Sequence, residues 1–582
     1  MLDPSMPRSS IETLLHAFIP AAHVHHTHPD AINVLAGSRD GERLVRECFG
    51  AQAVWIPYIR PGFTLAKQVG EAVRDQAGRR LVVLAKHGLV CWAETAEEAY
   101  RTTLAVIARA AEFVNERTVG KPRFGGAQRH APDLGETRRW SLLREVLPVL
   151  RGAVSSQTPK LLTVDLSARA VEFVSSAHGE NLVGVGAACP DHLVHTKRVP
   201  LWIPFDPRTE GAEALSARVR ERAAAYRREY ESYFQRYADE STARGDPDAR
   251  VILIQHVGLV AAGATLKQAA TSRDLYHRAI EVMAGADAVD EFVSLDERES
   301  FAVEYWPLEL YKLSKAPPPG ELQGRIALVT GAGGGIGRRL VQRLADAGAV
   351  VVGFDLDAEG ARDAMQSLAD EGLAVAGDVT DERDVENALG AAIDRFGGVD
   401  IVVSNAGIAS SAAIEETTLE EWQRNQSILG TGYFLVAREA FKLLRSQQLG
   451  GSVVFVASKN ALVAGKNASA YSSAKALELH LARCLAEEGG AAGIRVNTVN
   501  PDAVLEDSKI WSSSWREQRA ASYGIAPDEL EQHYRDRTVL HVNVLPEDIA
   551  QAVLHFASPS RSAKSTGNIL NVDGGQTAAY PR

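Results

Sequence analysis

Four histidines lie within the stretch HVHHTHPD, and their spacing suits a metal site. His26 and His28 are two residues apart, so on an extended strand both imidazoles point to the same side. His87, which ends the apolar run LVVLAKH, can supply a third ligand. Three imidazoles leave a coordination position open for water or substrate, as in a catalytic zinc site, and Glu12 can serve as the base. The alternative is a polar loop rich in histidine, with a core histidine elsewhere in the chain.

A glycine-rich stretch, TGAGGGIG, follows the strand-like run RIALVT and opens an amphipathic segment. Gly331 allows a tight turn, Gly335 lets the backbone approach a pyrophosphate, and Gly337 lets a helix pack close to the strand. The N-terminus of that helix offers free N–H groups and a positive dipole to phosphates. The stretch therefore predicts a dinucleotide-binding site.

The next strand-like run, VVVGFD, ends at Asp355, 24 residues after Gly331. An acid at this distance can bind the hydroxyls of the adenosine ribose, and its charge repels a 2′-phosphate. No Arg or Lys lies between Gly331 and Gly337 to reverse that preference. The sequence thus favours NAD over NADP.

The segment AYSSAKA places Tyr471 and Lys475 four residues apart, on one face of a helix. A nearby ammonium and the positive charge of a nicotinamide lower the pKa of a tyrosine, so that it can act as a base. Ser458, at the end of the strand-like run VVFVAS, can orient and polarise a substrate carbonyl. The alternative for the Tyr–Lys pair is an ordinary helical surface pair.

Taken together, these motifs resemble the short-chain dehydrogenase/reductase family, over about Gly324 to Arg582. The matching residues are Gly331, Gly335, Ile336, Gly337, Asp378, Val379, Asn405, Ala406, Gly407, Ser458, Tyr471, Lys475, Asn500 and Pro501. The resemblance implies that Asp378 and Val379 flank the adenine and that the Asn-Ala-Gly turn supports the central strand beside the cofactor. It also implies that Ser458, Tyr471 and Lys475 form the catalytic triad, and that Tyr471 and Lys475 bind the cofactor as well.

Two positions depart from that family. The family usually carries an asparagine seven residues after a tryptophan, where it holds a water of the proton relay. Counting from Trp422 reaches Leu429 instead. The family's usual Pro-Gly after the sixth strand is Pro501-Asp502 here.

The segment that follows Asp502 is long, and we expect it to form a lid over the substrate site. Its aromatic and cationic residues near the entrance are Trp511, Trp515, Arg516 and Arg519. Two alternatives carry equal weight: the two arginines bind an anion, or they are ordinary charged residues exposed to solvent.

The N-terminal stretches SSIETLLHAF, HTHPDAINVLAG, WIPYIRPGFTLAKQV and LAKHGLVCWAETAEEAY resemble the class II aldolase/adducin family. The resemblance implies that His26, His28 and His87 bind zinc, which would stabilise an enediolate, and that Glu12 moves the substrate proton. It matches Ser9 and Ser10 to positions that approach a substrate phosphate. The order of the domains resembles the bifunctional rhamnulose-phosphate aldolase/dehydrogenase fusions.

In class II aldolases a sizeable segment, including a phosphate-binding loop, precedes the acid that matches Glu12. Eleven residues precede Glu12 here, so we expect weak zinc binding and little aldolase activity from the chain as written. A working zinc-dependent lyase with a start further upstream is one alternative. A non-catalytic assembly module is another, because adducin-like members of the family are structural.

The elements that position these residues are predicted to form an α/β protein of several domains. We expect a class II aldolase-like α/β domain over residues 1–135 and a degenerate aldolase-like second half over 136–313. A proline-rich linker over 314–323 precedes a Rossmann domain over 324–582. In that domain strand-like and helix-like segments alternate, which predicts a doubly wound parallel sheet covered on both faces.

An internal repeat links the two N-terminal regions. RLVVLAKHGLVCWAETAEEA, from Arg80, aligns without gaps with RVILIQHVGLVAAGATLKQA, from Arg250, and six of the 20 positions are identical. Both copies are predicted to form a strand, a turn and a helix. His87 then matches Val257, so the second copy lacks this histidine.

The composition and charge of the chain limit the kinds of partner and compartment that we expect. A formal net charge of −11 argues against a nucleic-acid or membrane-surface binder. Four scattered cysteines predict core thiols in a reducing compartment rather than disulfides. No apolar run reaches membrane-spanning length, and the N-terminus lacks signal-peptide features. We expect a cytoplasmic homo-oligomer that acts on a small molecule.

Overall fold

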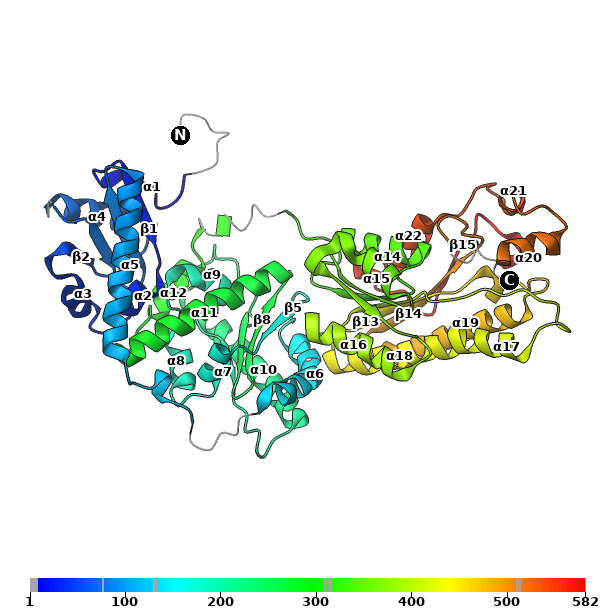
Figure 1. Cartoon of the computed structure of the whole chain (residues 1–582), viewed down its shortest axis with the longest axis horizontal. Coiled ribbons are helices and arrows are strands. Elements are labelled where there is room, and N and C mark those ends of the chain that lie inside the picture. The colour runs from blue at the N-terminus through cyan, green and yellow to red at the C-terminus, as the bar shows by residue number, and fades with distance from the viewer. Residues whose placement is uncertain are drawn as a thin grey trace. The chain divides into compact units, whose positions relative to one another are not determined.

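The computed structural model describes residues 9–75, 78–128, 134–307, 310, 311, 317–508, 511 and 514–580. Its contacts divide the chain into two compact units (Figure 1). Unit 1 is formed by Met1–Arg139, Thr163–Gly263 and Lys267–Pro317, and unit 2 by Trp140–Leu162, Ala264–Leu266 and Pro318–Arg582. Residues 314–316 of the predicted linker lie outside the described ranges. Within those ranges, every helix is too short or too polar to cross a lipid bilayer.

The first half of unit 1 is a four-stranded sheet in the order β1-β4-β3-β2. Its strands are β1 (His23–Thr27), β2 (Ala53–Ile56), β3 (Leu81–Leu84) and β4 (Gly88–Ala93). The helices are α1 (Thr13–Phe18), α2 (Asp30–Ala36), α3 (Gly41–Phe49), α4 (Phe63–Asp75) and α5 (Ala96–Thr118). Side chains alternate across the sheet: Val83 and Leu89 pack with α5, whereas Val82 and Val90 pack with α4.

The second half of unit 1 repeats this sheet in the order β5-β8-β7-β6. Its strands are β5 (Leu161–Asp165), β6 (Leu201–Ile203), β7 (Val251–Ile254) and β8 (Gly258–Gly263). The helices around it are α7 (Ala168–Val174), α8 (Gly179–Val185), α9 (Leu193–Thr196), α10 (Ala212–Tyr237), α11 (Leu266–Val289) and α12 (Glu297–Glu304). Helix α6 (Gly135–Ala153) begins in unit 1 and continues into unit 2. The predicted repeat is confirmed, although each copy contains a hairpin of two strands rather than a single strand. Lys86 and His256 hold the same left-handed position in the two hairpin turns, with φ of 56° and 63°.

Unit 2 contains a seven-stranded sheet in the order β11-β10-β9-β12-β13-β14-β15, which confirms the predicted doubly wound fold. All its pairings are parallel. Its strands are β9 (Ile326–Thr330), β10 (Val350–Asp355), β11 (Gly372–Ala376), β12 (Ile401–Ser404), β13 (Gly451–Val456), β14 (Ile494–Pro501) and β15 (Ile569–Val572). The edge strand β11 was not predicted, because its half-exposed run of Gly, Ala, Leu and Val is short and weakly apolar.

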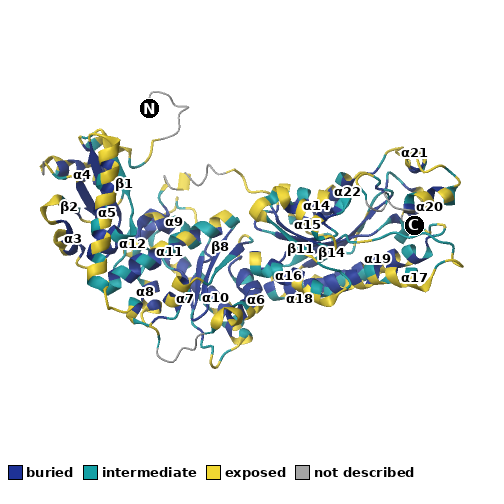
Figure 2. Ribbon diagram, in the orientation of Figure 1, coloured by how far each residue is buried: buried dark blue, intermediate teal, exposed yellow. Residues whose placement is uncertain are grey.

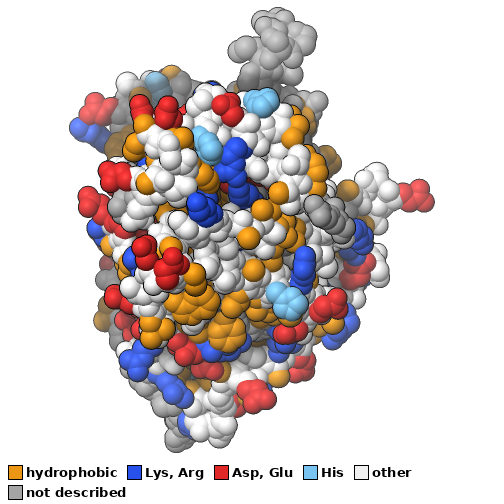
Figure 3. All heavy atoms as spheres, turned by 90° about the vertical axis from the view of Figure 1, so that its right-hand side faces the viewer, with side chains coloured by type: hydrophobic (Ala, Val, Ile, Leu, Met, Phe, Trp, Pro, Cys, Tyr) orange, Lys and Arg blue, Asp and Glu red, His pale blue; other side chains and the backbone are white. Residues whose placement is uncertain are grey.

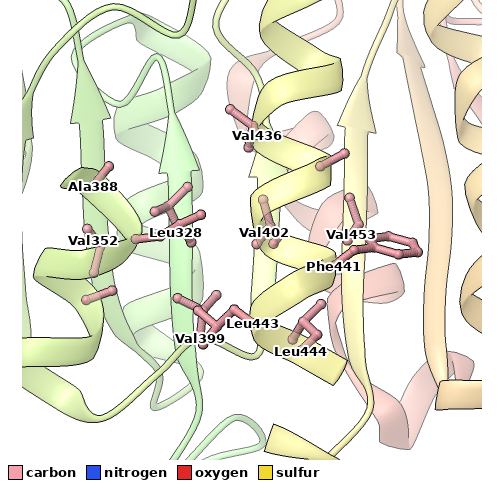
Figure 4. Close-up of a cluster of buried hydrophobic side chains, with 14 of the residues drawn as sticks. Leu328, Val352, Ala388, Val399, Val402, Val436, Phe441, Leu443, Leu444 and Val453 are labelled. Atoms are coloured by element: carbon pink, nitrogen blue, oxygen red, sulfur yellow. The ribbon is translucent and has the colours of Figure 1, made fainter. Parts of the chain in front are cut away.

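Helices cover both faces of this sheet, so its central strands are apolar throughout. Leu328, Val402 and Val453 pack beneath α16 (Glu382–Phe396) and α18 (Gly432–Gln447) (Figure 4). The opposite face packs against α14 (Gly335–Asp346) and α22 (Pro546–Ala557). The other helices are α15 (Ala358–Met365), α17 (Leu419–Asn425), α19 (Ser469–Gly489), α20 (Ser514–Tyr523), α21 (Leu530–Asp536) and α23 (Pro559–Ser562). Figure 2 shows buried strands and helices whose outer faces are exposed.

The segment Trp140–Leu162, which precedes most of unit 1 in the chain, belongs to unit 2. Arg151, fully buried on α6, donates to both oxygens of Asp400, at 3.0 and 2.6 Å. Asp400 is 1% exposed, and it also accepts the backbone N–H of Ile326 at 2.8 Å. This carboxylate, at the beginning of β12, is thus fully satisfied, with the α6 arginine as its counter-ion.

Candidate functional site

The glycine-rich turn between β9 and α14 has the close approaches that its sequence predicts. Gly331 adopts φ of 67°, and a Cβ there would lie 2.8 Å from Cα of Ala406. A Cβ on Gly337 would lie 1.9 Å from the carbonyl oxygen of Gly331. Any larger residue at either position would therefore displace the turn from the N-terminus of α14.

All the residues predicted from the sequence to line the dinucleotide path, apart from the Tyr–Lys pair, meet at one cavity of about 290 Å³. They are Gly331, Gly335, Ile336, Gly337, Asp355, Asp378, Val379, Asn405, Ala406 and Gly407. Asp355 ends β10, and its Oδ2 accepts the backbone N–H of Gly333 at 2.8 Å, so the carboxylate is fixed beside the glycine turn. Of the described residues that line this cavity, none is Lys or Arg.

The Asn-Ala-Gly turn after β12 is tied directly to the glycine turn. The hydroxyl of Thr330 accepts the backbone N–H groups of Asn405 and Ala406, at 2.9 and 3.0 Å. The side-chain amide of Asn405 donates to the carbonyls of Thr330 and Gly331, at 3.1 and 3.2 Å. These bonds hold the two loops that border the cavity in a fixed relation.

Ser458, Tyr471 and Lys475 line a second cavity of about 160 Å³, which shares Asn405 and Gly407 with the first. Ser458 follows β13, whereas Tyr471 and Lys475 lie on α19. The structure thus brings the predicted triad together beside the dinucleotide cavity. A proton acid or base, an ammonium and a hydroxyl donor around one cavity suit the oxidation of an alcohol or the reduction of a carbonyl.

Lys475 has a partner that the sequence analysis did not identify. Its ammonium lies 2.9 and 3.1 Å from the two carboxylate oxygens of Glu478, and 3.2 Å from the carbonyl oxygen of Val456. Glu478 is fully buried, and burial raises its pKa to about 8 although Lys475 acts in the opposite direction. The available signal was an acid three residues after Lys475 in a helix, a spacing that places both on one face.

The segment after Asp502 contributes α20 and α21 to the substrate cavity. Trp511, Trp515, Arg519 and Tyr534 line it, whereas Arg516 does not. Arg519 donates to the hydroxyls of Tyr534 and Tyr523, at 3.1 and 2.6 Å, and to the carbonyl oxygen of Lys466. These bonds give Arg519 a structural role and argue against the anion-binding alternative. Figure 3 shows this end of the molecule, where hydrophobic side chains reach the surface between charged ones.

Asp502, which departs from the family pattern, forms an ion pair inside the same cavity. Its Oδ2 lies 3.3 Å from the ammonium of Lys459, and both residues are buried. Burial raises the pKa of Asp502 despite the neighbouring Lys459 and Arg537. The pair adds charged groups that can bind substrate hydroxyls to a cavity that is also bordered by the rings of Trp511, Trp515 and Tyr534.

In unit 1 the structure brings together His26, His28, His87 and Glu12. The ring centroids of the three imidazoles lie 4.8 to 5.0 Å apart, and one ring nitrogen of each lies within 4.8 Å of the others. Glu12 Oε1 lies 3.1 Å from Nε2 of His26 and 4.0 Å from Nε2 of His87. This arrangement fits a metal ion with three nitrogen ligands and an adjacent carboxylate.

The surroundings of the imidazoles also suit a cation. His87 is 1% exposed, and neither of its ring nitrogens has a hydrogen-bond partner among the described residues. Burial and the neighbouring histidines hold its pKa well below 6.5, so the ring is neutral, as a ligand must be. Nδ1 of His26 donates to the carbonyl of Leu89 at 3.0 Å, which directs its Nε2 into the cluster.

His28 is held by residues from the second half of unit 1. Its Nδ1 lies 3.4 Å from Oδ2 of Asp191 and 3.5 Å from Sγ of Cys189. Its Nε2 faces Nε2 of His26 at 3.1 Å. No local pattern in the sequence connects Asp191 or Cys189 with a histidine more than 160 positions earlier. The predicted weak zinc binding stays a prediction, but these contacts and Leu89 supply orienting partners for two of the three histidines.

The second copy of the sheet is apolar at the equivalent positions. A Cβ on Gly88 would lie 2.5 Å from Cδ2 of His28, and a Cβ on Gly258 would lie 2.6 Å from Cδ2 of Leu166. Leu166 therefore takes the place of His28, and Val164, two residues earlier, that of His26. Val257 takes the place of His87, as the alignment predicts.

Two further predictions have simple outcomes. Ser9 and Ser10 are exposed, and Ser10 Oγ accepts the backbone N–H of Glu12 at 3.3 Å; phosphate binding by these serines stays a prediction. All four cysteines are free thiols, but Cys484 is exposed, so the prediction that all are core residues is wrong for this one. It lies on the outer face of the amphipathic α19.

Three family models match the chain. They are the class II aldolase and adducin N-terminal domain over residues 2–114, the second domain of class II aldolase over 141–313, and enoyl-(acyl carrier protein) reductase over 331–577. The uncharacterized oxidoreductase YuxG of Bacillus subtilis is 50% identical, over 100% of this chain and 85% of that protein.

Other relatives match unit 2 alone. D-threitol dehydrogenase of Mycolicibacterium smegmatis is 34% identical over 44% of this chain and 94% of that protein. Sorbitol-6-phosphate 2-dehydrogenase of Escherichia coli is 33% identical over 43% of this chain and 98% of that protein. Among solved structures, 3-ketoacyl-(acyl-carrier-protein) reductase from Brucella melitensis, complexed with NADH, is 31% identical over 44% of this chain and 99% of that chain, with a TM-score of 0.40.

Proposed function

This chain belongs to the family of oxidoreductases in which class II aldolase-type domains precede a short-chain dehydrogenase/reductase domain, and from that premise we propose an NAD-dependent dehydrogenase that acts on a small hydroxyaldehyde or a sugar-derived alcohol or carbonyl. The observation that carries the proposal is the meeting of Ser458, Tyr471 and Lys475 at a cavity continuous with the predicted dinucleotide path.

The preference for NAD is supported by Asp355. Its carboxylate is fixed by the N–H of Gly333 where the ribose of a bound dinucleotide is expected. A 2′-phosphate in that place would meet this negative charge, and the described lining offers no cation to compensate. The preference therefore comes from repulsion of NADP as well as from attraction of NAD.

The chain's own residues supply the acid–base chemistry, and bound NAD supplies the hydride acceptor. In the oxidation direction the Tyr471 phenolate accepts the proton of the substrate hydroxyl, and the Ser458 hydroxyl binds the same oxygen. The ammonium of Lys475 stabilises the phenolate. In reduction Tyr471 returns the proton to the forming alkoxide.

The proposed substrate class is supported by the composition of the cavity and by the relatives of unit 2. Trp511, Trp515 and Tyr534 supply apolar walls, while the Lys459–Asp502 pair supplies charges that can bind hydroxyl groups. Two relatives act, by their names, on threitol and on sorbitol 6-phosphate. A small molecule with several hydroxyls satisfies both observations.

A second candidate function, metal-dependent aldol cleavage, is favoured by the cluster in unit 1. His26, His28 and His87 would hold a zinc ion, which would supply a Lewis acid for an enediolate, and Glu12 would move the substrate proton. The aldehyde released would then be a substrate of the proposed dehydrogenase. If unit 1 is instead a non-catalytic assembly module, it requires no metal, so metal content separates these alternatives.

The proposed dehydrogenase function is tested with the purified full chain. NAD and NADP are each offered with a panel of small diols, hydroxyaldehydes and sugar alcohols, and cofactor reduction is followed by absorbance. We expect turnover with at least one member of the panel and a strong preference for NAD. Equal efficiency with NADP would contradict the cofactor assignment, and no turnover across the panel would contradict the substrate class.

A further inference from the structure

We propose that Glu478 is a positioning residue of the dehydrogenase site, which holds the ammonium of Lys475 and thereby sets the pH at which Tyr471 works. The proposal rests on the dehydrogenase function proposed above. It adds to the triad a carboxylate that does not touch substrate or cofactor and that acts through Lys475.

The geometry of the pair carries the proposal. Both oxygens of Glu478 lie within 3.1 Å of the Lys475 ammonium, and the carbonyl of Val456 is 3.2 Å from it. Lys475 and Glu478 are three residues apart on α19, so they share the helix face that is directed into the protein. The side chain of Glu478 is completely buried and that of Lys475 is 6% exposed, so water does not screen the pair.

The neighbourhood offers the ammonium no other anionic partner among the described residues. Tyr433 of α18 lies next to it, with the ammonium 5.3 Å from the ring centre, but its hydroxyl is committed to the carbonyl of Val456 at 2.8 Å. Leu429, in the π-helical stretch Gln426–Thr431, fills the space beside Gly407 with an apolar side chain. Glu478 is therefore the charged partner that, with the carbonyl of Val456, orients Lys475.

The pair has an electrostatic consequence for Tyr471. An ammonium alone favours the phenolate form of a neighbouring tyrosine, whereas a carboxylate beside that ammonium offsets part of the effect. The titratable groups that face the pair are Tyr471 on α19 and Tyr433 from α18. Burial raises the pKa of Glu478 and the ammonium of Lys475 acts in the opposite direction, so the two side chains behave as one coupled pair.

The test is the pH dependence of alcohol oxidation by the full chain. In Glu478→Gln the shape of the side chain is kept and its negative charge is lost. We expect the rising limb of kcat/KM to move to lower pH by about 1 unit, because the uncompensated ammonium stabilises the phenolate. NADH binding, followed by fluorescence, is expected to persist. The matched control is Glu487→Gln, an exposed position on the same helix, which should leave the profile unchanged.

The possible outcomes are distinct. A profile of Glu478→Gln that superimposes on the wild type overturns the positioning role. If Glu478→Gln does not fold, Glu478→Asp is the second variant, because it retains the charge on a shorter side chain. We expect a smaller shift of its rising limb in the same direction. An unshifted limb in Glu478→Asp also overturns the positioning role. If the wild type oxidises alcohols with NAD but the variant's pH profile does not shift, only this inference is refuted. If the wild type shows no NAD-dependent oxidation, the proposed function is refuted as well.

Discussion

Leu166 lies beside Gly258 in the same way that His28 lies beside Gly88. The two halves of unit 1 share a sheet order and a hairpin turn, yet one half buries imidazoles where the other buries aliphatic side chains. The second half nevertheless contacts the histidine cluster of the first, because Asp191 and Cys189 face Nδ1 of His28. The copy that lacks the histidines therefore supplies side chains that can orient His28.

This role predicts that Asp191 contributes to metal affinity. In Asp191→Asn the carboxylate that faces Nδ1 of His28 is lost, and we expect zinc to bind about 10-fold more weakly, the lower end for partners of this type because Asp191 is 64% exposed. Zinc affinity is measured by competition with a chromogenic chelator. Glu213→Gln, an exposed change in the same half, is the control, and equal affinity in the two variants would remove Asp191 from the site.

Tyr471→Phe is expected to lower kcat by a factor on the order of 10²–10⁴, because the proton acceptor is lost from an otherwise intact site. Binding of NADH should be retained, since the dinucleotide cavity is bordered by other residues. Steady-state kinetics and fluorescence titration measure the two properties. Near-normal turnover in this variant would place the acid–base chemistry on another residue.

The cofactor preference is expected to respond to changes at the end of β10. Asp355→Ala with Leu356→Arg replaces a repelling charge with an attracting one, and Leu356 is 74% exposed on the lining of the same cavity. We expect the ratio of kcat/KM for NADP to that for NAD to rise about 10-fold or more. Leu356→Ala alone is the control, and an unchanged ratio in the double variant would show that another residue sets the preference.

Arg151 and Arg144 offer a matched pair of stability variants on α6. Arg151→Ala leaves the buried Asp400 carboxylate without its counter-ion, and we expect a loss of about 3–5 kcal/mol. Arg144 also pairs with an acid of unit 2, Asp394, but both side chains are partly exposed, so Arg144→Ala should cost about 0–1 kcal/mol. Urea unfolding of the full chain is followed through the loss of NADH binding. Equal midpoints for the two variants would contradict the importance of burial.

Sequence patterns predicted those parts of both sites whose residues lie close together in the chain. The glycine turn, Asp355 and the Tyr471–Lys475 spacing each follow from a strand end or a helical repeat, and the structure places them at adjoining cavities. The histidine pair follows from the period of a strand: His26 lies on β1, and His28 directly follows the end of that strand.

Residues that act across long sequence distances were not predictable in the same way. Asp191 reaches His28, and Arg151 reaches Asp400, only because separate helices and loops pack together. Helical spacing could have placed Glu478 beside Lys475, but the sequence does not distinguish a buried glutamate from one exposed to solvent. Its importance depends on burial, which only the packed structure supplies.

The membership of most of α6 in unit 2 has a consequence for how the chain can be divided. Asp400 obtains its counter-ion from a residue encoded almost 250 positions earlier, with most of unit 1 between them. A gene fragment that begins at the proline run would encode a dehydrogenase with an uncompensated carboxylate in its core. Division of the chain at that point is therefore expected to leave the dehydrogenase domain less stable than it is in the full chain.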